Sequence, residues 1–203
     1  MNFLAHFHLA GPEEGVIAGA LEGEYFKGTL ASTLQHPLNI GIRQHRAIDA
    51  FTDAHDEVVE LRKHFSVDLR RYAGILIDLS FDHFLSKHWH TFCDTPLEAF
   101  SRSVYNALNN RTGQLSDPAR RMHTRMLQHN ILCLYQDWRT VAQAARNIGG
   151  RLKRGNALEN VGPELDPLSA SIESVFLSFY PQLQAFSDQK LRQLQLEMNH
   201  ASQ

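Results

Sequence analysis

Apolar residues recur at intervals of three and four along most of this chain, which is the spacing that places them on one face of an α-helix. The clearest helical patterns cover residues 13–30, 37–65, 68–92, 95–110, 117–127, 131–148 and 169–187. Alternation of apolar and polar residues is nowhere long enough to require a sheet. The pattern therefore predicts an all-α fold, a helical bundle that forms a single domain over residues 1–203.

Several residues mark where these helices begin, end or approach one another. Thr95 is the expected N-cap of one helix, with Pro96 in its first turn and Glu98 closing a capping box. Glycines at positions 15, 19, 23 and 28 either weaken the helix over 13–30 or allow backbones to come close. Residues 149–167 are rich in Gly and Pro and predict a loop or hinge, and the polar C-terminal stretch is expected to fray.

The stretch HRAIDAFTD concentrates candidate chemistry on the helix over 37–65. His45, Asp49 and Asp53 follow one another in steps of four, so one helix can present them as a ladder. Leu38 and Ile42 share the face of His45 and Asp49, so the ladder continues an apolar surface. Because a buried ionisable group needs a partner or a metal, this stretch is the predicted working centre.

A second pair of carboxylates lies on the next predicted helix. Asp78 and Asp82 are four residues apart, and Leu85 and Trp89 fall on the same face. Each carboxylate would cost on the order of several kcal/mol if it were buried and ionised without compensation. A divalent cation or a fixed arginine would offset that cost.

Two interpretations follow from these residues alone. In the first, imidazoles and carboxylates on adjacent helices hold Mn, Fe or Mg. In the second, His45 and Arg46 pair with acidic residues of the neighbouring helix in a buried structural network. Spacing alone does not decide between them.

Composition narrows the class of protein. The chain has 203 residues, 43% of them hydrophobic and 21% charged, which is enough for one ordinary core. A formal net charge of -2 gives no general argument for nucleic-acid binding. The two cysteines, Cys93 and Cys133, do not have the spacing of a metal site. Neither a signal peptide nor a membrane span is evident in the sequence. We therefore expect a cytoplasmic protein, with no membrane or nucleic-acid partner. Phosphate-binding loops, nucleophile elbows and HExxH motifs are also missing from the sequence.

Three segments together resemble the acyl carrier protein phosphodiesterases, also called acyl carrier protein hydrolases: MNFLAHFHLA, HRAIDAFTD and DLSFDHFLSKHW. The resemblance is strongest over residues 1–92 and continues more loosely through QDW at 136–138 and FYP at 179–181. It implies a divergent member of the all-helical HD phosphatase and phosphodiesterase group. It also implies a divalent metal, typically Mn²⁺ with Mg²⁺ or Fe²⁺ as alternatives. The implied reaction removes 4'-phosphopantetheine from holo acyl carrier protein and leaves the apo form.

The resemblance also assigns site residues. His45 and Asp49 match the metal-binding His and Asp of the family, and Asp78 and Asp82 match acidic positions of the downstream motif. His6 and His8 match the N-terminal motif, for which the resemblance implies a role in metal binding or in phosphate protonation. Glu24 stands where the family usually has an Asp in a GNxxxDF-like segment. Glu is one methylene longer than Asp, and the Asn of that segment is missing. The reach of this ligand, the metal preference or the substrate is therefore expected to differ from those of the family.

The roles implied by this resemblance are those of a metal-assisted hydrolase. The expected metal ligands are His45, Asp49, Glu24 and an acid from the second helix. Arg46 is expected to neutralise non-bridging oxygens, and His6 or His83 to protonate the leaving seryl oxygen. Because acyl carrier protein is acidic, basic clusters near Arg70, Arg120 or Arg151 are candidates for its docking.

Two alternative functions remain compatible with the sequence. One is a metal-dependent phosphohydrolase of another phosphoester, such as a nucleotide. The other is a helical module that binds the carrier protein without turnover, its polar ladder being structural.

Overall fold

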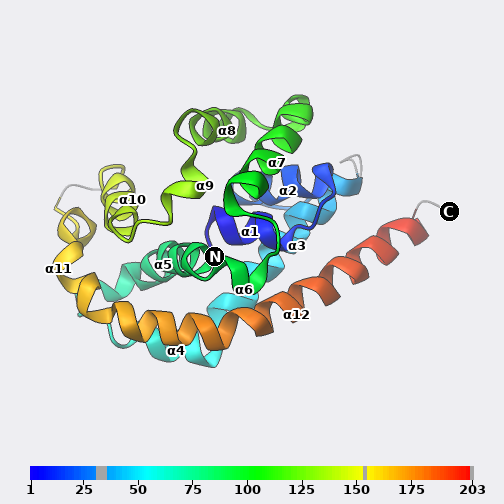
Figure 1. Cartoon of the computed structure of the whole chain (residues 1–203). Coiled ribbons are helices and arrows are strands. Elements are labelled where there is room, and N and C mark those ends of the chain that lie inside the picture. Colours follow the sequence, from blue (N-terminus) through cyan, green and yellow to red (C-terminus); the bar gives the residue numbers. More distant parts are fainter. Residues whose placement is uncertain (31–35, 153–154, 202–203) are drawn as a thin grey trace.

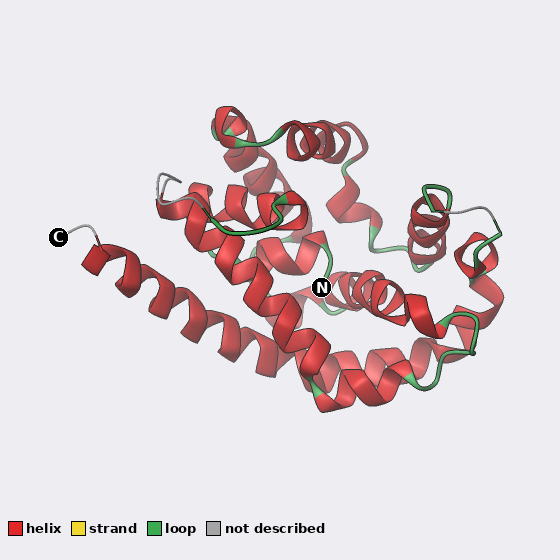
Figure 2. Ribbon diagram, turned by 180° about the vertical axis from the view of Figure 1, so that it is seen from behind, coloured by secondary structure: helices red, strands yellow, loops and turns green. Residues whose placement is uncertain are grey.

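The computed structural model describes residues 1–30, 36–152 and 155–201, and every regular element in these ranges is a helix (Figures 1 and 2). The prediction of an all-α fold is confirmed. None of the helices in these ranges is both long enough and apolar enough to cross a membrane.

Seven longer helices form the body of the molecule: α2 (Glu14–Tyr25), α3 (His36–Ala54), α5 (Ala73–Lys87), α7 (Leu97–Asn110), α8 (Asp117–His129), α10 (Arg139–Gly149) and α12 (Ser169–Ala201). Shorter α-helices lie between them: α1 (Phe3–Leu9), α4 (Asp56–Arg62), α6 (Trp89–Phe92), α9 (Ile131–Leu134) and α11 (Gly162–Leu165). Single 3₁₀ turns are η1 (Arg70–Tyr72), η2 (Thr112–Gln114), η3 (Ala157–Asn160) and η4 (Asp166–Leu168).

Helix α1 is short but central. It packs against α2, α5 and α12, and the N-terminus lies near the middle of the molecule (Figure 1). Leu4, Ala5 and Phe7 are buried in the same hydrophobic core as the inward faces of the longer helices. The first residues of the chain are therefore part of the core and bring their polar neighbours with them.

Glycines let the backbones of α2 and α3 touch. A Cβ atom added to Gly19 would lie 2.3 Å from the carbonyl oxygen of Leu38, and one added to Gly41 would lie 2.2 Å from the carbonyl oxygen of Val16. Both distances are well inside van der Waals contact. Gly19 in α2 and Gly41 in α3 therefore mark a close approach of the two helices, and α2 forms in spite of its glycines.

Several predicted helix boundaries are wrong. The helix predicted over 37–65 is divided at His55, where the extended backbone turns α4 back onto α12. The one predicted over 68–92 begins with η1 and is interrupted at His88. The one predicted over 131–148 is divided between α9 and α10, with Thr140 donating to the carbonyl of Leu134 across the break.

Helix ends also differ from the sequence pattern. Pro96, not Thr95, is the N-cap of α7, and no side chain caps it. Helix α2 ends at Tyr25, since the backbone of Phe26 is extended. The carbonyl groups of Phe26 and Gly28 accept hydrogen bonds from Arg46. Helix α12 continues past Ser187 to Ala201, tied to α3 by the Gln44–Ser187 hydrogen bond.

The predicted loop or hinge contains further helical structure. Residues 155–167 include η3, α11 and part of η4, and they pack against α10. Leu158, Val161 and Leu165 are completely buried there. This segment therefore contributes to the core.

The backbone contact between α2 and α3 generates a stability prediction. Gly41→Ala should lower the free energy of unfolding by about 2–3 kcal/mol, because its methyl group would overlap the backbone of α2. Urea denaturation measures the change. Gly113→Ala is the matched control: nothing lies within 4 Å of its added Cβ, so its effect should stay within about 0.5 kcal/mol. Equal stability of the two variants would contradict the proposed close contact.

Candidate metal centre

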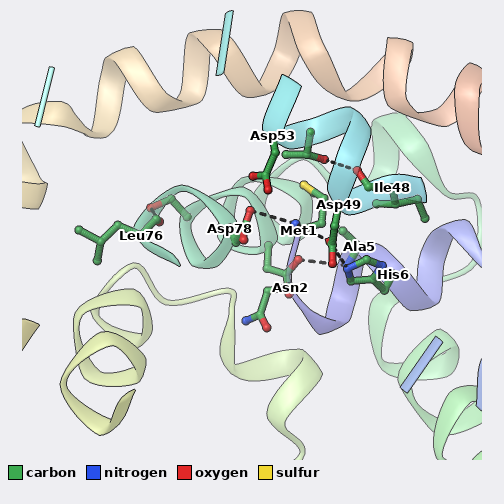
Figure 3. Close-up of polar contacts among 12 residues, drawn as sticks. Met1, Asn2, Ala5, His6, Ile48, Asp49, Asp53, Leu76 and Asp78 are labelled. Atoms are coloured by element: carbon green, nitrogen blue, oxygen red, sulfur yellow. Dashed lines mark hydrogen bonds and ion pairs between the residues drawn. The ribbon is translucent and has the colours of Figure 1, made fainter. Parts of the chain in front are cut away.

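Two histidines and one aspartate meet where α1 crosses α3. His6 comes from α1, and His45 and Asp49 come from α3; one ligand atom from each lies within 4.8 Å of the others. His6 Nε2 is 3.1 Å from Asp49 Oδ1, and His45 Nε2 is 3.2 Å from Asp49 Oδ2. The two imidazole rings stack with their centroids 3.8 Å apart. Figure 3 shows His6 facing Asp49 across this junction.

The orientation of His45 is set by helix α2. Its Nδ1 donates to the carbonyl oxygen of Ala20 at 2.8 Å, which turns Nε2 toward Asp49. Gly23 leaves the space for this ring, since an added Cβ there would lie 2.4 Å from His45 Cγ. In the tautomer with its proton on Nδ1, a neutral imidazole has a lone pair on Nε2. The contact of His45 Nε2 with Asp49 Oδ2 therefore requires either a second proton on the ring, which makes it a hydrogen bond, or a cation between the two atoms.

His6 adds a second unmet bonding capacity. Its side chain is buried, and among the described residues its Nδ1 has no hydrogen-bond partner. Burial lowers the pKa of His6 to about 3, with the neighbouring His45 acting in the same direction, so the ring stays neutral. Neutral imidazole is the form that binds metals. The donor set of two imidazoles and a carboxylate therefore fits a divalent cation.

Asp49 connects this buried pair to solvent. Burial raises its pKa, but hydrogen bonds with His45 and His6 outweigh that effect and hold the pKa well below the ordinary value. Its side chain is 42% exposed, whereas His6 and His45 are almost fully covered. A substrate would therefore reach the centre from the side of Asp49.

Asp78 joins the site through the α-amino group of Met1. This ammonium group is buried, 2.9 Å from Asp78 Oδ1 and 3.4 Å from Asp49 Oδ1 (Figure 3). Burial alone would lower its pKa, but the two carboxylates raise the pKa to about 10. Sequence reasoning missed this cation because it belongs to no side chain.

Asp82 has a different place in the structure. Its carboxylate is buried and accepts hydrogen bonds from the backbone N–H groups of Leu4 at 2.7 Å and Ala5 at 3.1 Å. Burial raises its pKa to about 7 in spite of these hydrogen bonds. Asp82 therefore anchors the first turn of α1 and positions His6 from a distance, and its role as a ligand stays a prediction.

The remaining predicted residues lie outside the His6–His45–Asp49 cluster, and their roles stay predictions. Glu24 is exposed at the end of α2, close enough for the charges of His45 and Asp49 to act on its carboxyl group. Arg46 donates to the carbonyl oxygens of Phe26 and Gly28, both at 2.9 Å. His83 Nδ1 donates to the carbonyl oxygen of Tyr135 at 2.7 Å.

Two further residues of the predicted motifs have structural partners. Asp53 is exposed and pairs with Arg62, so the ladder from His45 does not extend to it as part of the centre. His8 points the other way from His6, toward the hydroxyl of Tyr180 and the carbonyl of Phe92. The two N-terminal histidines are thus separated around α1, as their spacing predicts for a helix.

Comparison with known proteins identifies relatives along nearly the whole chain. The family model described as acyl carrier protein phosphodiesterase matches residues 1–183. A protein of that name from Escherichia coli O157:H7 (strain EC4115 / EHEC) is 33% identical over 194 residues, covering 94% of this chain and 99% of the relative. One from Photorhabdus laumondii subsp. laumondii is 29% identical over 191 residues, covering 94% and 96%. No solved structure matches, so the relationship to the HD group stays a prediction.

The geometry predicts which aspartate of α3 binds a metal. Asp49→Asn should weaken Mn²⁺ binding by about a hundredfold or more, because it removes the negative charge of the carboxylate in this cluster of two imidazoles and one carboxylate. Isothermal titration with Mn²⁺ measures the change, and circular dichroism checks that the variant is folded. Asp53→Asn, one turn farther along the same helix, should bind Mn²⁺ as the unaltered protein does. Equal binding by both variants would remove Asp49 from the ligand set.

Proposed function

This chain belongs to the acyl carrier protein phosphodiesterase family, and we propose that it removes 4'-phosphopantetheine from holo acyl carrier protein by a metal-dependent hydrolysis. The family match spans residues 1–183 and includes the whole candidate centre. The observation that carries the metal dependence is the convergence of ligand atoms of His6, His45 and Asp49, together with the buried His6 Nδ1, which has no partner among the described residues. A purely structural network would also pair this nitrogen with a donor or acceptor of the protein.

The residues at the centre suit a divalent cation with mixed nitrogen and oxygen ligands. His6, His45 and Asp49 would hold it, and such a set favours Mn²⁺ or Fe²⁺ over Mg²⁺, which prefers oxygen ligands alone. When bound, the cation polarises phosphoryl oxygens and lowers the pKa of water toward neutrality.

The chain itself supplies orientation and charge. The Ala20 carbonyl fixes the ring of His45, and the Met1 ammonium group holds the carboxylates of Asp49 and Asp78 together. Glu24 lies at the exposed edge of the centre, where its longer side chain can approach a substrate phosphate or a second ligand position. Arg46 fixes the segment that follows Glu24 and so acts as a positioning residue.

An exposed basic rim, formed by Arg125 and Arg151, supports the proposal that the substrate is an acidic protein. Arg125 on α8 and Arg151 after α10 are both exposed. Burial raises the pKa of Tyr25 to about 12, and these two guanidinium groups lie near enough to oppose that rise. Tyr25 follows Glu24, so the rim lies beside the centre. Arg120, by contrast, is held by Asp117 and by the carbonyl of Leu115.

Mass spectrometry of the carrier tests the substrate assignment. Incubation of holo acyl carrier protein with the Mn²⁺-loaded protein should convert it to the apo mass and release phosphopantetheine. Asp49→Asn should slow this conversion by about a thousandfold or more, and Asp53→Asn should leave it unchanged. No release by a protein with verified bound metal would contradict the proposal. Hydrolysis of a nucleotide panel without release from the carrier would favour the alternative phosphohydrolase.

The basic rim should steer association with the acidic carrier. Arg125→Glu and Arg151→Glu should each lower kcat/KM several-fold at low ionic strength, with the difference shrinking above about 0.5 M salt. Steady-state assays at several salt concentrations measure the effect. Arg192→Glu is a control of equal charge change in the C-terminal half of α12, which extends away from α8 and α10 (Figures 1 and 2). An equal loss in the control, or a loss independent of salt, would contradict steering by this rim.

A further inference from the structure

A second feature beside the candidate centre is a mostly apolar cavity of about 200 Å³ between the start of α1 and helices α5, α8, α9 and α10. Its apolar walls are formed by Phe3, Leu79, Met122, Ile131, Leu134 and Ile148. Leu134 keeps 47% of its surface exposed. Apolar walls that remain accessible in a folded protein are typical of a ligand site.

The cavity lies one residue along the chain from two residues of the candidate metal centre, Met1 and Asp78. One wall includes Asn2, which follows Met1, and another includes Leu79, which follows Asp78. The Met1 ammonium group is in direct contact with Asp49 and Asp78, so both walls begin one residue from the centre. Asn2 points away from Asp49 (Figure 3) and donates to the hydroxyl of Tyr135, a further wall residue.

The polar side chains that line the cavity are all uncharged. Asn2, Gln143 and Asn147 carry amide side chains, and Thr140 carries a hydroxyl. Gln143 and Asn147 bond to each other at 3.1 Å along the exposed side of α10. A lining of this composition suits a narrow ligand in which methyl and methylene groups alternate with amides.

We propose that this cavity receives the pantetheine arm of the substrate, with the thiol or acyl end included, while the phosphodiester lies at the metal centre. The inference rests on the proposed function, which places a phosphate that carries such an arm beside Asp49. The arm consists of a dimethyl-bearing segment, two amides and a thiol or thioester, and so matches apolar walls edged with amide groups. The cavity would thereby select substrates by the arm and its acyl group.

Two alanines of α10 offer a matched test by filling the cavity. Ala144 lines it, whereas Ala142 lies two residues away on the same helix, is similarly half-buried and does not line it. Binding is measured by isothermal titration with pantetheine and with S-octanoylpantetheine, neither of which carries the phosphate. This measurement does not depend on turnover.

We expect the unaltered protein to bind S-octanoylpantetheine more tightly than pantetheine. Ala144→Phe should weaken binding of the octanoyl compound by about tenfold or more, and Ala142→Phe should leave it unchanged. Gln143→Trp, at an exposed position on the cavity wall, provides a second obstructing variant should Ala144→Phe fail to fold. With holo carrier, the obstructing variants should raise KM and change kcat little.

Three results would overturn the inference. They are no binding of either compound by the unaltered protein, unchanged binding by both obstructing variants, and binding of plain octanoate as tight as that of S-octanoylpantetheine. Failure of the proposed function itself would show separately, as no release of phosphopantetheine by the unaltered, metal-loaded protein.

Discussion

The contact between the backbones of α2 and α3 determines where His45 can lie. Gly19 and Gly41 bring the two helices together, and Gly23 leaves room for the imidazole ring farther along the same face. Only at this separation does the Ala20 carbonyl accept the Nδ1 proton of His45 at 2.8 Å. The ring is then fixed in orientation and tautomer, with Nε2 directed at Asp49. Packing between two helices thus sets the chemistry at the centre.

A second constraint fixes the other histidine. The buried carboxylate of Asp82 accepts the first N–H groups of α1, so a helix of only seven residues has a defined start. The desolvation of this carboxylate costs on the order of several kcal/mol, which its two hydrogen bonds partly offset. His6 follows Ala5 directly, and its ring stacks on that of His45, so that each imidazole contacts a different oxygen of Asp49. The Met1 ammonium group completes the arrangement by linking Asp49 to Asp78.

Much of the fold could be predicted from the sequence, because periodic burial determines it. The apolar faces around Ile42, Leu85 and Phe176 are buried as their spacing indicates. The breaks at His55 and His88 could not be predicted, since they depend on how α4 and α6 turn toward partners distant in the sequence. Helical periodicity contains no information about such turns.

The candidate site was predictable to a similar extent. The step of four between His45 and Asp49 and the family resemblance indicated both residues, and the structure places them together. The same spacing also indicated Asp53. In the structure Asp53 pairs with Arg62 of α4, and the position of α4 cannot be derived from spacing within α3. Spacing gave Asp78 and Asp82 equal weight, yet one contacts Met1 and the other anchors α1. A helical wheel contains no information about tertiary contacts of this kind.

We propose that water activated at the centre formed by His6, His45 and Asp49 hydrolyses the phosphodiester of the carrier. The most direct measurement is turnover of holo acyl carrier protein in water enriched in ¹⁸O, with mass spectrometry of both products. We expect one ¹⁸O atom in the phosphate of the released phosphopantetheine and none in the apo carrier, since water attacks phosphorus and the serine keeps its oxygen. Incorporation of ¹⁸O into the carrier, or no release of the arm, would contradict it.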